Sequence, residues 1–243
     1  MSSYWKHVNS VLKESDLILE VLDARMIEET RNREIEAKII RYNKPVLYVI
    51  NKCDLVGLEE LQKIKKSLNP SVFISSTDKL GTTILKKKIM EMSRGERVVV
   101  GVVGYPNVGK SSLINALSGR KAAKTSSTSG FTQGLQKIKV DNKILLLDTP
   151  GVFPLRENND YKYGKTGAID YAKIRDPELI ALKIIQEHKA QIVKHYKLSA
   201  EDDEEQLLEK LAFKFGKLQA AGEPNLEGAA RKLLKDWQSG EIK

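Results

Sequence analysis

The fold class of this chain is decided by residues 98–111, which read Val98-Val99-Val100-Gly101-Val102-Val103-Gly104-Tyr105-Pro106-Asn107-Val108-Gly109-Lys110-Ser111. The first six residues are apolar and mostly β-branched, which predicts a buried strand. The last eight match the pattern G-x-x-x-x-G-K-[ST], and an apolar helical segment follows them. A strand, a glycine-rich loop and a helix in this order let backbone N–H groups converge on a phosphate.

Several side chains around this loop are expected to bind phosphate and metal. Lys110 supplies a positive charge to the outer phosphates, and Ser111, Thr132 and Asp148 are expected to hold Mg²⁺, Asp148 through water. Gly151, in Asp148-Thr149-Pro150-Gly151, is expected to donate its amide to the γ-phosphate. Within the loop itself, the nucleotide-binding residues expected are Asn107, Val108, Gly109, Lys110, Ser111 and Ser112.

A second motif, Asn51-Lys52-Cys53-Asp54, follows the strand predicted at residues 45–50. Its Asp54 can accept hydrogen bonds from the N1–H and N2–H₂ edge of guanine, an edge that adenine lacks. Asn51 is expected at the other edge of the base, with Lys52 lying over it and Cys53 between. Asn51 and Asp54 disfavour an ATP-dependent P-loop enzyme, because polar groups built for guanine would stay unpaired. Ser75, Ser76 and Thr77 form the least typical element, expected to offer a backbone N–H.

The order of these motifs is rotated relative to ordinary GTPases. There the phosphate loop comes first and the guanine motif fourth, whereas here the guanine motif precedes the phosphate loop by about fifty residues. All five elements are present in cyclic order. The chain therefore looks like a circularly permuted P-loop GTPase domain of the α/β class, with a mostly parallel sheet in a three-layer α/β/α arrangement and every motif at a strand's carboxyl end.

Further apolar runs predict strands at residues 17–22, 72–74 and 144–147. The tail predicts a smaller C-terminal helical domain, so we expect domains at residues 1–169 and 170–243. Asn225 is expected to cap the last helix, and Glu201 to Glu205 to begin another. Helical spacing relates Leu207, Leu208, Leu211, Phe215 and Leu218, with Lys210, Lys214 and Lys217 along another face that either contacts RNA or is simply solvated.

Position 152 is informative because small signalling GTPases place a glutamine there to orient water. Val152 cannot form that hydrogen bond, so hydrolysis needs another group, an ion or a partner. Asn107, in G-x-x-N-x-G-K-S, suggests a K⁺ ion held near the phosphates; the alternative is that Asn107 only shapes the loop. The residues expected to act in catalysis are thus Lys110, Thr132, Gly151 and, through K⁺, Asn107.

Charge and composition constrain the partners. The chain carries a net charge of +9; residues 170–243 hold 13 Lys and Arg against 14 Asp and Glu, so the remaining 28 and 18 lie in residues 1–169. This basic excess favours polyanions, with an inert basic surface as the alternative. One cysteine, no signal-peptide pattern and no long apolar run predict a cytoplasmic protein without membrane contact, expected to be monomeric.

The motif order, Asp23-Ala24-Arg25 after the first strand, Val152 and the stretch Gly104 to Asn115 together resemble the YlqF/YawG family of nucleostemin-like GTPases. The resemblance covers residues 5 to 155 most densely. It implies binding of GTP and GDP with Mg²⁺, hydrolysis of GTP, and a partner in ribosomal RNA on the large ribosomal subunit precursor. The Phe-Pro-Gly-His sequence of bacterial members has no counterpart here, so His7 inherits no role in hydrolysis.

Two functions of different classes remain open on the sequence. The first is a GTPase that hydrolyses GTP to GDP and phosphate and uses turnover to leave an assembling ribosome. The second is a nucleotide-dependent RNA-binding scaffold whose hydrolysis is incidental. Both need the same binding motifs, although Thr132, Asp148 and Asn107 favour the first.

Overall fold

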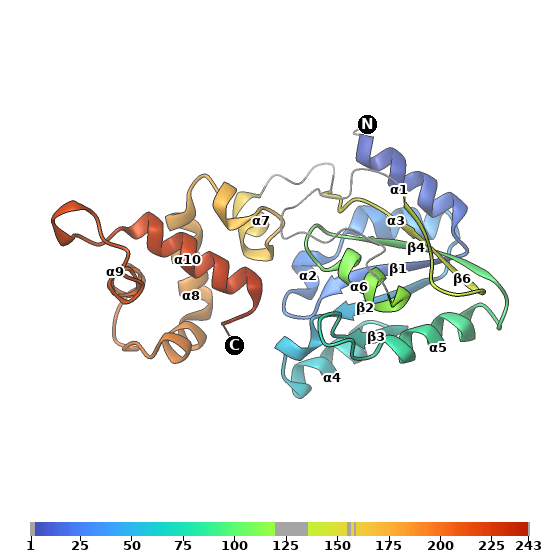
Figure 1. The fold of residues 1–243 in the computed structure, drawn as a ribbon, viewed down its shortest axis with the longest axis horizontal. Coiled ribbons are helices and arrows are strands. Elements are labelled where there is room, and N and C mark those ends of the chain that lie inside the picture. The colour runs from blue at the N-terminus through green and yellow to red at the C-terminus, as the bar shows by residue number, and fades with distance from the viewer. Residues whose placement is uncertain (1–2, 120–135, 155–156, 158, 243) are drawn as a thin grey trace. The chain divides into compact units, whose positions relative to one another are not determined.

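The computed structural model describes residues 3–119, 136–154, 157 and 159–242 (Figure 1). It divides the chain into two compact units, Met1–Glu157 and Asn158–Lys243. This division falls earlier than the boundary expected between residues 169 and 170. The difference arises because a short helix, α7 (Asp160–Thr166), packs against two helices of the second unit, α8 (Pro177–Tyr196) and α10 (Leu226–Ser239).

The first unit is built on a six-stranded sheet with the order β3-β2-β1-β4-β6-β5. Every neighbouring pair is parallel except β5 and β6. The strands are β1 (Leu17–Asp23), β2 (Val46–Asn51), β3 (Ser71–Ile74), β4 (Val98–Gly104), β5 (Gln136–Lys139) and β6 (Ile144–Asp148). The five parallel strands confirm the predicted apolar runs. The antiparallel edge strand β5 was not predicted.

Helices cover both faces of this sheet (Figure 1). They are α1 (Ser3–Glu14), α2 (Ile27–Thr30), α3 (Arg33–Arg41), α4 (Leu58–Ser67), α5 (Thr82–Met92) and α6 (Lys110–Ser118). The helices α1 and α3 share one core cluster with Ile18, and α4 shares another with Leu22. Ile18 and Leu22 point to the same side of β1, because side chains alternate along a strand. The helices α5 and α6 pack on each other and on the sheet.

Strand β1 lies in the middle of the sheet and is buried along its whole length. Five of its seven residues are apolar, as expected of a strand covered on both faces, but Glu20 and Asp23 are buried as well. Glu20 accepts a hydrogen bond from the backbone N–H of Asn32 at 3.3 Å. Burial raises the pKa of Glu20 to about 8, with a further contribution from the nearby Glu36.

The second unit is helical and has its own core, contributed by α8, α9 (Glu204–Lys214) and α10. Two predicted helix starts are confirmed: Asp203 forms a capping box with Gln206, and Asn225 accepts from the backbone N–H of Gly228 at 2.8 Å. The prediction that Leu218 belongs to the apolar face of α9 is wrong. Leu218 lies beyond the end of α9 and is exposed, since the chain turns at Gly216 with φ 62°.

The described part of the chain, with its gaps at 120–135, 155–156 and 158, contains no helix that is both long and apolar enough to cross a membrane.

Candidate nucleotide-binding site

The phosphate loop joins β4 to α6, as its sequence predicts. Three of its residues have positive φ: Gly104 at 150°, Asn107 at 60° and Gly109 at 93°. Gly109 has a second constraint, because a Cβ there would lie 2.3 Å from Asn51 Nδ2. Only glycine allows the loop to approach Asn51 this closely.

Lys110 is buried at the first position of α6 and turns back over the loop. Its Nζ donates to the carbonyl of Gly104 at 3.1 Å and to that of Tyr105 at 2.8 Å. Burial lowers the pKa of Lys110 to about 8, and the neighbouring Asp148 carboxylate opposes that shift. The ammonium group is thus held inside the curve of the loop, where the outer phosphates of a nucleotide would gain its charge.

Asp148 ends β6 beside this ammonium group. Both carboxylate oxygens are buried and have no hydrogen-bond partner among the described residues. Burial raises the pKa of Asp148 to about 6, while Lys110 and the Thr149 amide oppose the shift. A buried carboxylate with unused oxygens fits a hydrated Mg²⁺, and Ser111, the direct ligand expected from the sequence, lies on the first turn of α6. Thr132, the third expected ligand, lies outside the described residues.

The segment after Asp148 is fixed against the phosphate loop. The Thr149 hydroxyl donates to the Val102 carbonyl at 2.8 Å. A Cβ on Gly151 would meet the Pro106 Cα at 2.7 Å and Lys110 Nζ at 3.0 Å, so the backbone of residue 151 touches the loop. The amide expected to meet a γ-phosphate therefore lies at the phosphate loop.

Asn51 joins the guanine motif to both neighbouring loops. Its Nδ2 donates to the Val108 carbonyl at 2.8 Å, and its Oδ1 accepts from the Ser76 amide at 3.1 Å and the Ser76 hydroxyl at 2.8 Å. The sequence suggested a contact between Asn51 and the base edge. That contact stays a prediction; in the structure the side chain forms hydrogen bonds to protein on both sides and so connects the three motifs.

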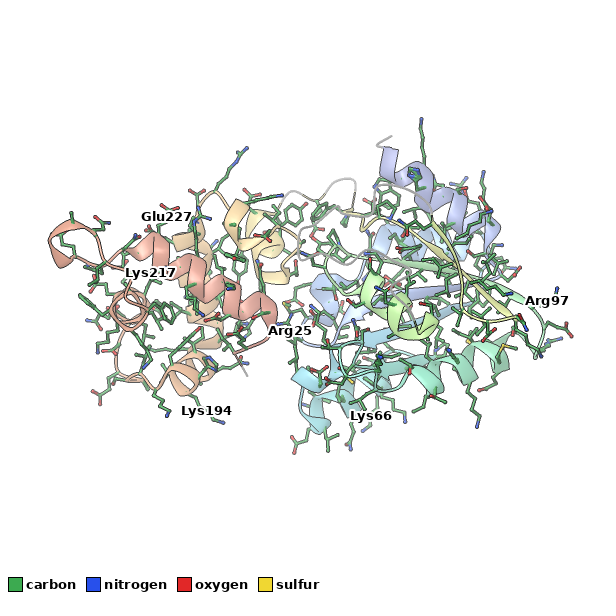
Figure 2. The ribbon with its side chains drawn as sticks, in the orientation of Figure 1. Arg25, Lys66, Arg97, Lys194, Lys217 and Glu227 are labelled. Carbon is green, nitrogen blue, oxygen red and sulfur yellow. The ribbon has the colours of Figure 1, made fainter. Side chains whose placement is uncertain are left out.

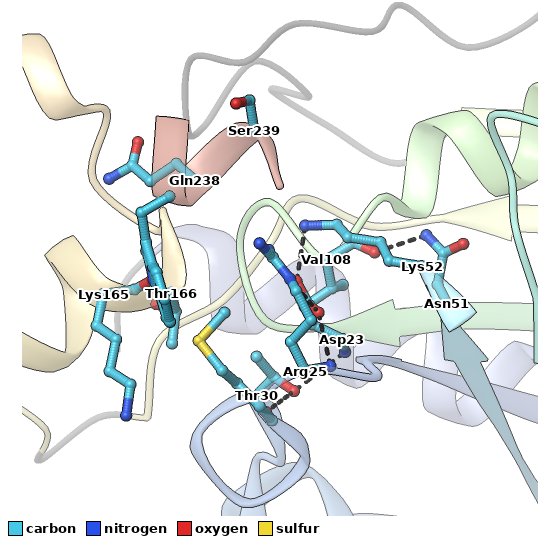
Figure 3. A network of polar contacts seen from close by, with 12 residues as sticks. Asp23, Arg25, Thr30, Asn51, Lys52, Val108, Lys165, Thr166, Gln238 and Ser239 are labelled. Carbon is cyan, nitrogen blue, oxygen red and sulfur yellow. Dashed lines mark hydrogen bonds and ion pairs between the residues drawn. The ribbon is translucent and has the colours of Figure 1, made fainter. Parts of the chain in front are cut away.

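The rest of the guanine motif is arranged around a left-handed residue, Lys52, with φ 60°. Its Nζ forms an ion pair with the buried Asp23 at 2.7 Å (Figure 3). Cys53 is half-buried, and burial raises the pKa of its thiol. Asp54 is exposed and forms no hydrogen bond or ion pair with the described residues. Its carboxylate is available for a ligand.

The loop of Ser75, Ser76 and Thr77 follows β3 and closes on itself, because Ser75 and Leu80 exchange two backbone hydrogen bonds at 3.3 and 3.0 Å. Ser75 is buried, and its hydroxyl donates to Asp78 at 3.2 Å. Ser76 is half-buried against Asn51, and Thr77 is exposed. This loop lies beside the guanine motif, although its sequence is atypical.

Sequence reasoning gave Asp23 no chemical role, yet it organises this end of the sheet. Its carboxylate accepts two hydrogen bonds from the Arg25 guanidinium, at 3.0 and 2.8 Å, and one from the Arg25 amide (Figure 3). Together with Lys52, these cations hold the pKa of Asp23 well below its usual range in spite of burial. A carboxylate directly after a buried strand, next to the guanine motif in the sheet, was the signal that could have found it.

Tyr105 and Val152 complete the surroundings of the loop. Tyr105 is buried, its ring meets that of Phe153 edge-on at 5.5 Å between centroids, and its hydroxyl donates to Glu157 at 3.2 Å. The Val152 side chain is buried in the cluster of α1 and α3, so it faces away from water. Val152 therefore acts as a core residue.

Motifs spread over residues 51 to 151 thus meet at the carboxyl end of one parallel sheet, the place where doubly wound proteins bind ligands. The fold and the site define a P-loop protein arranged for a guanine nucleotide, with the order of its elements permuted. A family model described as 50S ribosome-binding GTPase matches residues 99–212. The match begins at β4, the strand that leads to the phosphate loop.

Two relatives agree with this class. The chain is 42% identical over 246 residues to an uncharacterized GTP-binding protein of Methanocaldococcus jannaschii, which covers 98% of this chain and 65% of that protein. It is 33% identical to the GTPase Grn1 of Schizosaccharomyces pombe, over 99% of this chain and 61% of the relative. The chain therefore spans less than two thirds of these proteins.

A solved structure shows the same fold: GNP-bound YlqF from T. maritima superposes with a TM-score of 0.72 at 21% identity, over 99% of this chain and 95% of that one. The chain therefore has the circularly permuted GTPase fold of YlqF, and its sequence is similar to the two GTP-binding relatives along almost its whole length.

Proposed function

We propose that the protein binds GTP and GDP with Mg²⁺ and hydrolyses GTP to GDP and phosphate. Asp54 reads the base, and Lys110 and the loop amides of Val108, Gly109, Ser111 and Ser112 hold the phosphates. Ser111 and Asp148 hold the metal, which neutralises charge on the phosphate oxygens during phosphoryl transfer. The observation that carries the proposal is the pair of contacts from Asn51 to Val108 and Ser76, because it fixes the base-reading and phosphate-binding loops relative to each other.

Hydrolysis of GTP also needs a group that stabilises the reacting phosphates. Val152 is buried and cannot orient water, so a positive charge near the phosphates is needed from elsewhere. We propose that Asn107, in the left-handed conformation of the loop, holds a K⁺ ion for this purpose, with Thr132 assisting the metal. Turnover without a partner is then slow, and a partner particle accelerates it.

We further propose that the partner is ribosomal RNA of the large ribosomal subunit precursor, bound by a monomer in the cytoplasm. The description of the matching family model, 50S ribosome-binding GTPase, and the basic excess of residues 1–169 support this partner. Exposed basic side chains such as Lys66 and Arg97 point outward from the first unit (Figure 2). The direct test is GTP turnover measured with large-subunit particles, with small-subunit particles and without either.

Base recognition is tested by Asp54→Asn. The amide donates where the carboxylate accepted, and xanthine carries a carbonyl in place of the guanine amino group, so preference should shift from GTP to xanthosine triphosphate. A loss of GTP affinity of roughly a hundred-fold or more is expected, since two charge-assisted hydrogen bonds are replaced. Competition binding of the two nucleotides measures the ratio. An unchanged ratio would show that Asp54 does not read the base.

The alternative, a nucleotide-dependent RNA-binding scaffold, is separated from this proposal by turnover. A scaffold binds particles in a GTP-dependent manner but shows no stimulated hydrolysis. The uncommitted, buried carboxylate of Asp148 beside Lys110 favours the hydrolysing protein, because such a pair suits charge development at the phosphates.

A further inference from the structure

We infer that Asn32 is a positioning residue, which fixes the segment after Asp148-Thr149-Pro150-Gly151 so that the Gly151 amide is aimed at a γ-phosphate. The inference rests on the proposed binding of GTP. It concerns a residue outside the five nucleotide-binding motifs, at the start of α3. Asn32 reaches the site through one buried hydrogen bond to Val152, 120 positions further along the chain.

Asn32 is fully buried and has two separate tasks. Its Oδ1 caps α3 by accepting from the amides of Glu34 at 3.1 Å and Ile35 at 3.2 Å. Its Nδ2 donates to the carbonyl of Val152 at 3.1 Å. The side-chain oxygen is therefore bound to helix α3, and the side-chain nitrogen is bound to the segment that follows Gly151. Because an amide cannot rotate freely between such partners, the cap fixes the direction of the donor.

The backbone of Asn32 is held from the other side by β1. Its N–H donates to the buried Oε1 of Glu20 at 3.3 Å. Glu20 lies at the centre of the sheet, on the strand that pairs with both the guanine-motif strand β2 and the phosphate-loop strand β4. The position of Asn32, and through it that of Val152, is thus tied to the strands that carry the nucleotide site.

Val152 is held at three points in addition to this hydrogen bond. Its side chain is buried with residues of α1 and α3, the preceding Gly151 touches Pro106, and the following Phe153 meets Tyr105. None of these apolar contacts fixes the rotation of the peptide plane that joins Val152 to Phe153, which comes two planes after the one that carries the Gly151 amide. The bond from Asn32 to the Val152 carbonyl does, because a carbonyl accepts in or near its own plane.

Loss of the hydrogen bond from Asn32 to Val152 should affect binding of the triphosphate and not of the diphosphate. Only GTP has a γ-phosphate for the Gly151 amide, whereas GDP uses the phosphate loop alone. A loosened Val152 carbonyl should therefore weaken binding of GTP and leave binding of GDP unchanged. A residue that merely supports the fold would weaken both nucleotides together.

The test uses the full chain with Asn32→Asp and Asn32→Ser. Both variants keep an oxygen that caps α3, and both lose the amide N–H₂ group that reaches Val152. Asn225→Asp is the matched control, because it makes the same change at the cap of α10, in the helical unit. Affinities for GDP and for a non-hydrolysable GTP analogue are measured with Mg²⁺. We expect the two Asn32 variants to lose about ten-fold in analogue affinity with GDP affinity unchanged, and the control to change neither.

Equal losses for GDP and the analogue, or no loss for either, would overturn the inference. A wild-type chain that binds neither guanine nucleotide would overturn the proposed function instead. For that case hydrogen exchange of residues 148–154 without nucleotide supplies an independent measure. The inference requires faster exchange there in Asn32→Asp than in wild type, and equal exchange would refute it.

Discussion

At the scale of single residues, Glu20 is an acid held without charge in the middle of a sheet. Its pKa of about 8 lies above the ordinary 4.5, so between these values the folded chain binds a proton that the unfolded chain releases. Stability from this group is therefore lost as pH rises from about 4.5 to about 8, by roughly 1 kcal/mol per pH unit.

Glu20→Gln should remove this dependence, because the amide keeps the acceptor for Asn32 and cannot ionise. The variant is expected to gain stability relative to wild type as pH rises from 5.5 to 7.5. Urea unfolding of both proteins at three pH values measures the difference in midpoint. Parallel curves across that range would contradict the buried, protonated state of Glu20.

Asn107 supports a second residue-scale prediction. If it holds K⁺, turnover should rise when K⁺ replaces Na⁺ at constant ionic strength, and Asn107→Ala should abolish the difference while GDP still binds. Intrinsic rates without a supplied positive charge are on the order of 10⁻⁴ s⁻¹, so single-turnover assays are sensitive enough. Equal rates of the wild-type protein in the two salts would exclude the ion.

At the scale of elements, the two glycines that flank α6 make a matched pair. Both have positive φ, 93° for Gly109 and 66° for Gly119. A Cβ on Gly109 would lie 2.3 Å from Asn51, whereas one on Gly119 would have no atom of the described residues within 4 Å. Gly119→Ala should cost about 1 kcal/mol for the left-handed backbone and leave nucleotide affinity intact.

Gly109→Ala carries the same backbone cost and also separates the phosphate loop from Asn51. Its nucleotide affinity should fall at least a hundred-fold while thermal unfolding shifts by a few degrees, as for its partner variant. Calorimetric titration with GDP and a thermal melt of each variant decide the matter. Similar affinities for the two variants would mean that the close approach of loop and Asn51 is unimportant.

The sequence predicted best those strands whose own residues form a continuous apolar run. Strands β1, β2, β3, β4 and β6 were predictable because each is an apolar run that ends at a motif. Strand β5 was not, since only Ile138 of its four residues is buried and the others are polar. This strand lies at the edge of the sheet and forms backbone hydrogen bonds to β6. One buried side chain among four residues makes no alternating pattern that the sequence could show.

The site shows the same limit. The phosphate loop and the guanine motif could be read from residues alone, since their spacing is dictated by the nucleotide. The role of Asn32 could not, because it depends on Val152, a partner brought close only by the fold. Asp23 stood out as a carboxylate at the end of a buried strand, but its partner Lys52 became clear only in the fold. The division into two compact units also falls earlier than the expected boundary. The seven-residue helix α7 is too short for its sequence to show which helices it packs against.

At the scale of the whole molecule, the two units differ in net charge. The lysines Lys86, Lys87 and Lys88 lie on α5 of the basic unit, and Lys88 pairs with Glu91 at 2.9 Å. Lys210 in the helical unit is held by Asp202 at 2.6 Å, and residues 170–243 carry 13 Lys and Arg against 14 Asp and Glu, which together weaken the case for an RNA-binding face on α9. Affinity for RNA should therefore come mainly from the first unit.

Replacing Lys86, Lys87 and Lys88 by Gln should weaken binding of the GTP-bound protein to large-subunit particles. The slope of log affinity against log salt should fall by roughly one unit per lost phosphate contact. Lys210→Gln with Lys217→Gln serves as the control and should change the slope little. Co-sedimentation across a salt series gives both values. No preference of wild type for large-subunit particles over unrelated structured RNA would end the ribosomal assignment.

The position of β1 between β2 and β4 has a consequence for the newly made chain. Synthesis delivers β1, β2 and β3 early, and β4 follows only after the whole of α5, so one side of the central strand stays open while the ribosome adds the 74 residues between Asp23 and Val98. At 5–20 residues per second this lasts roughly 4 to 15 seconds. A nascent chain halted at residue 95 should therefore be captured by chaperones, and one extended well past β6 should not, because only the longer chain closes its sheet.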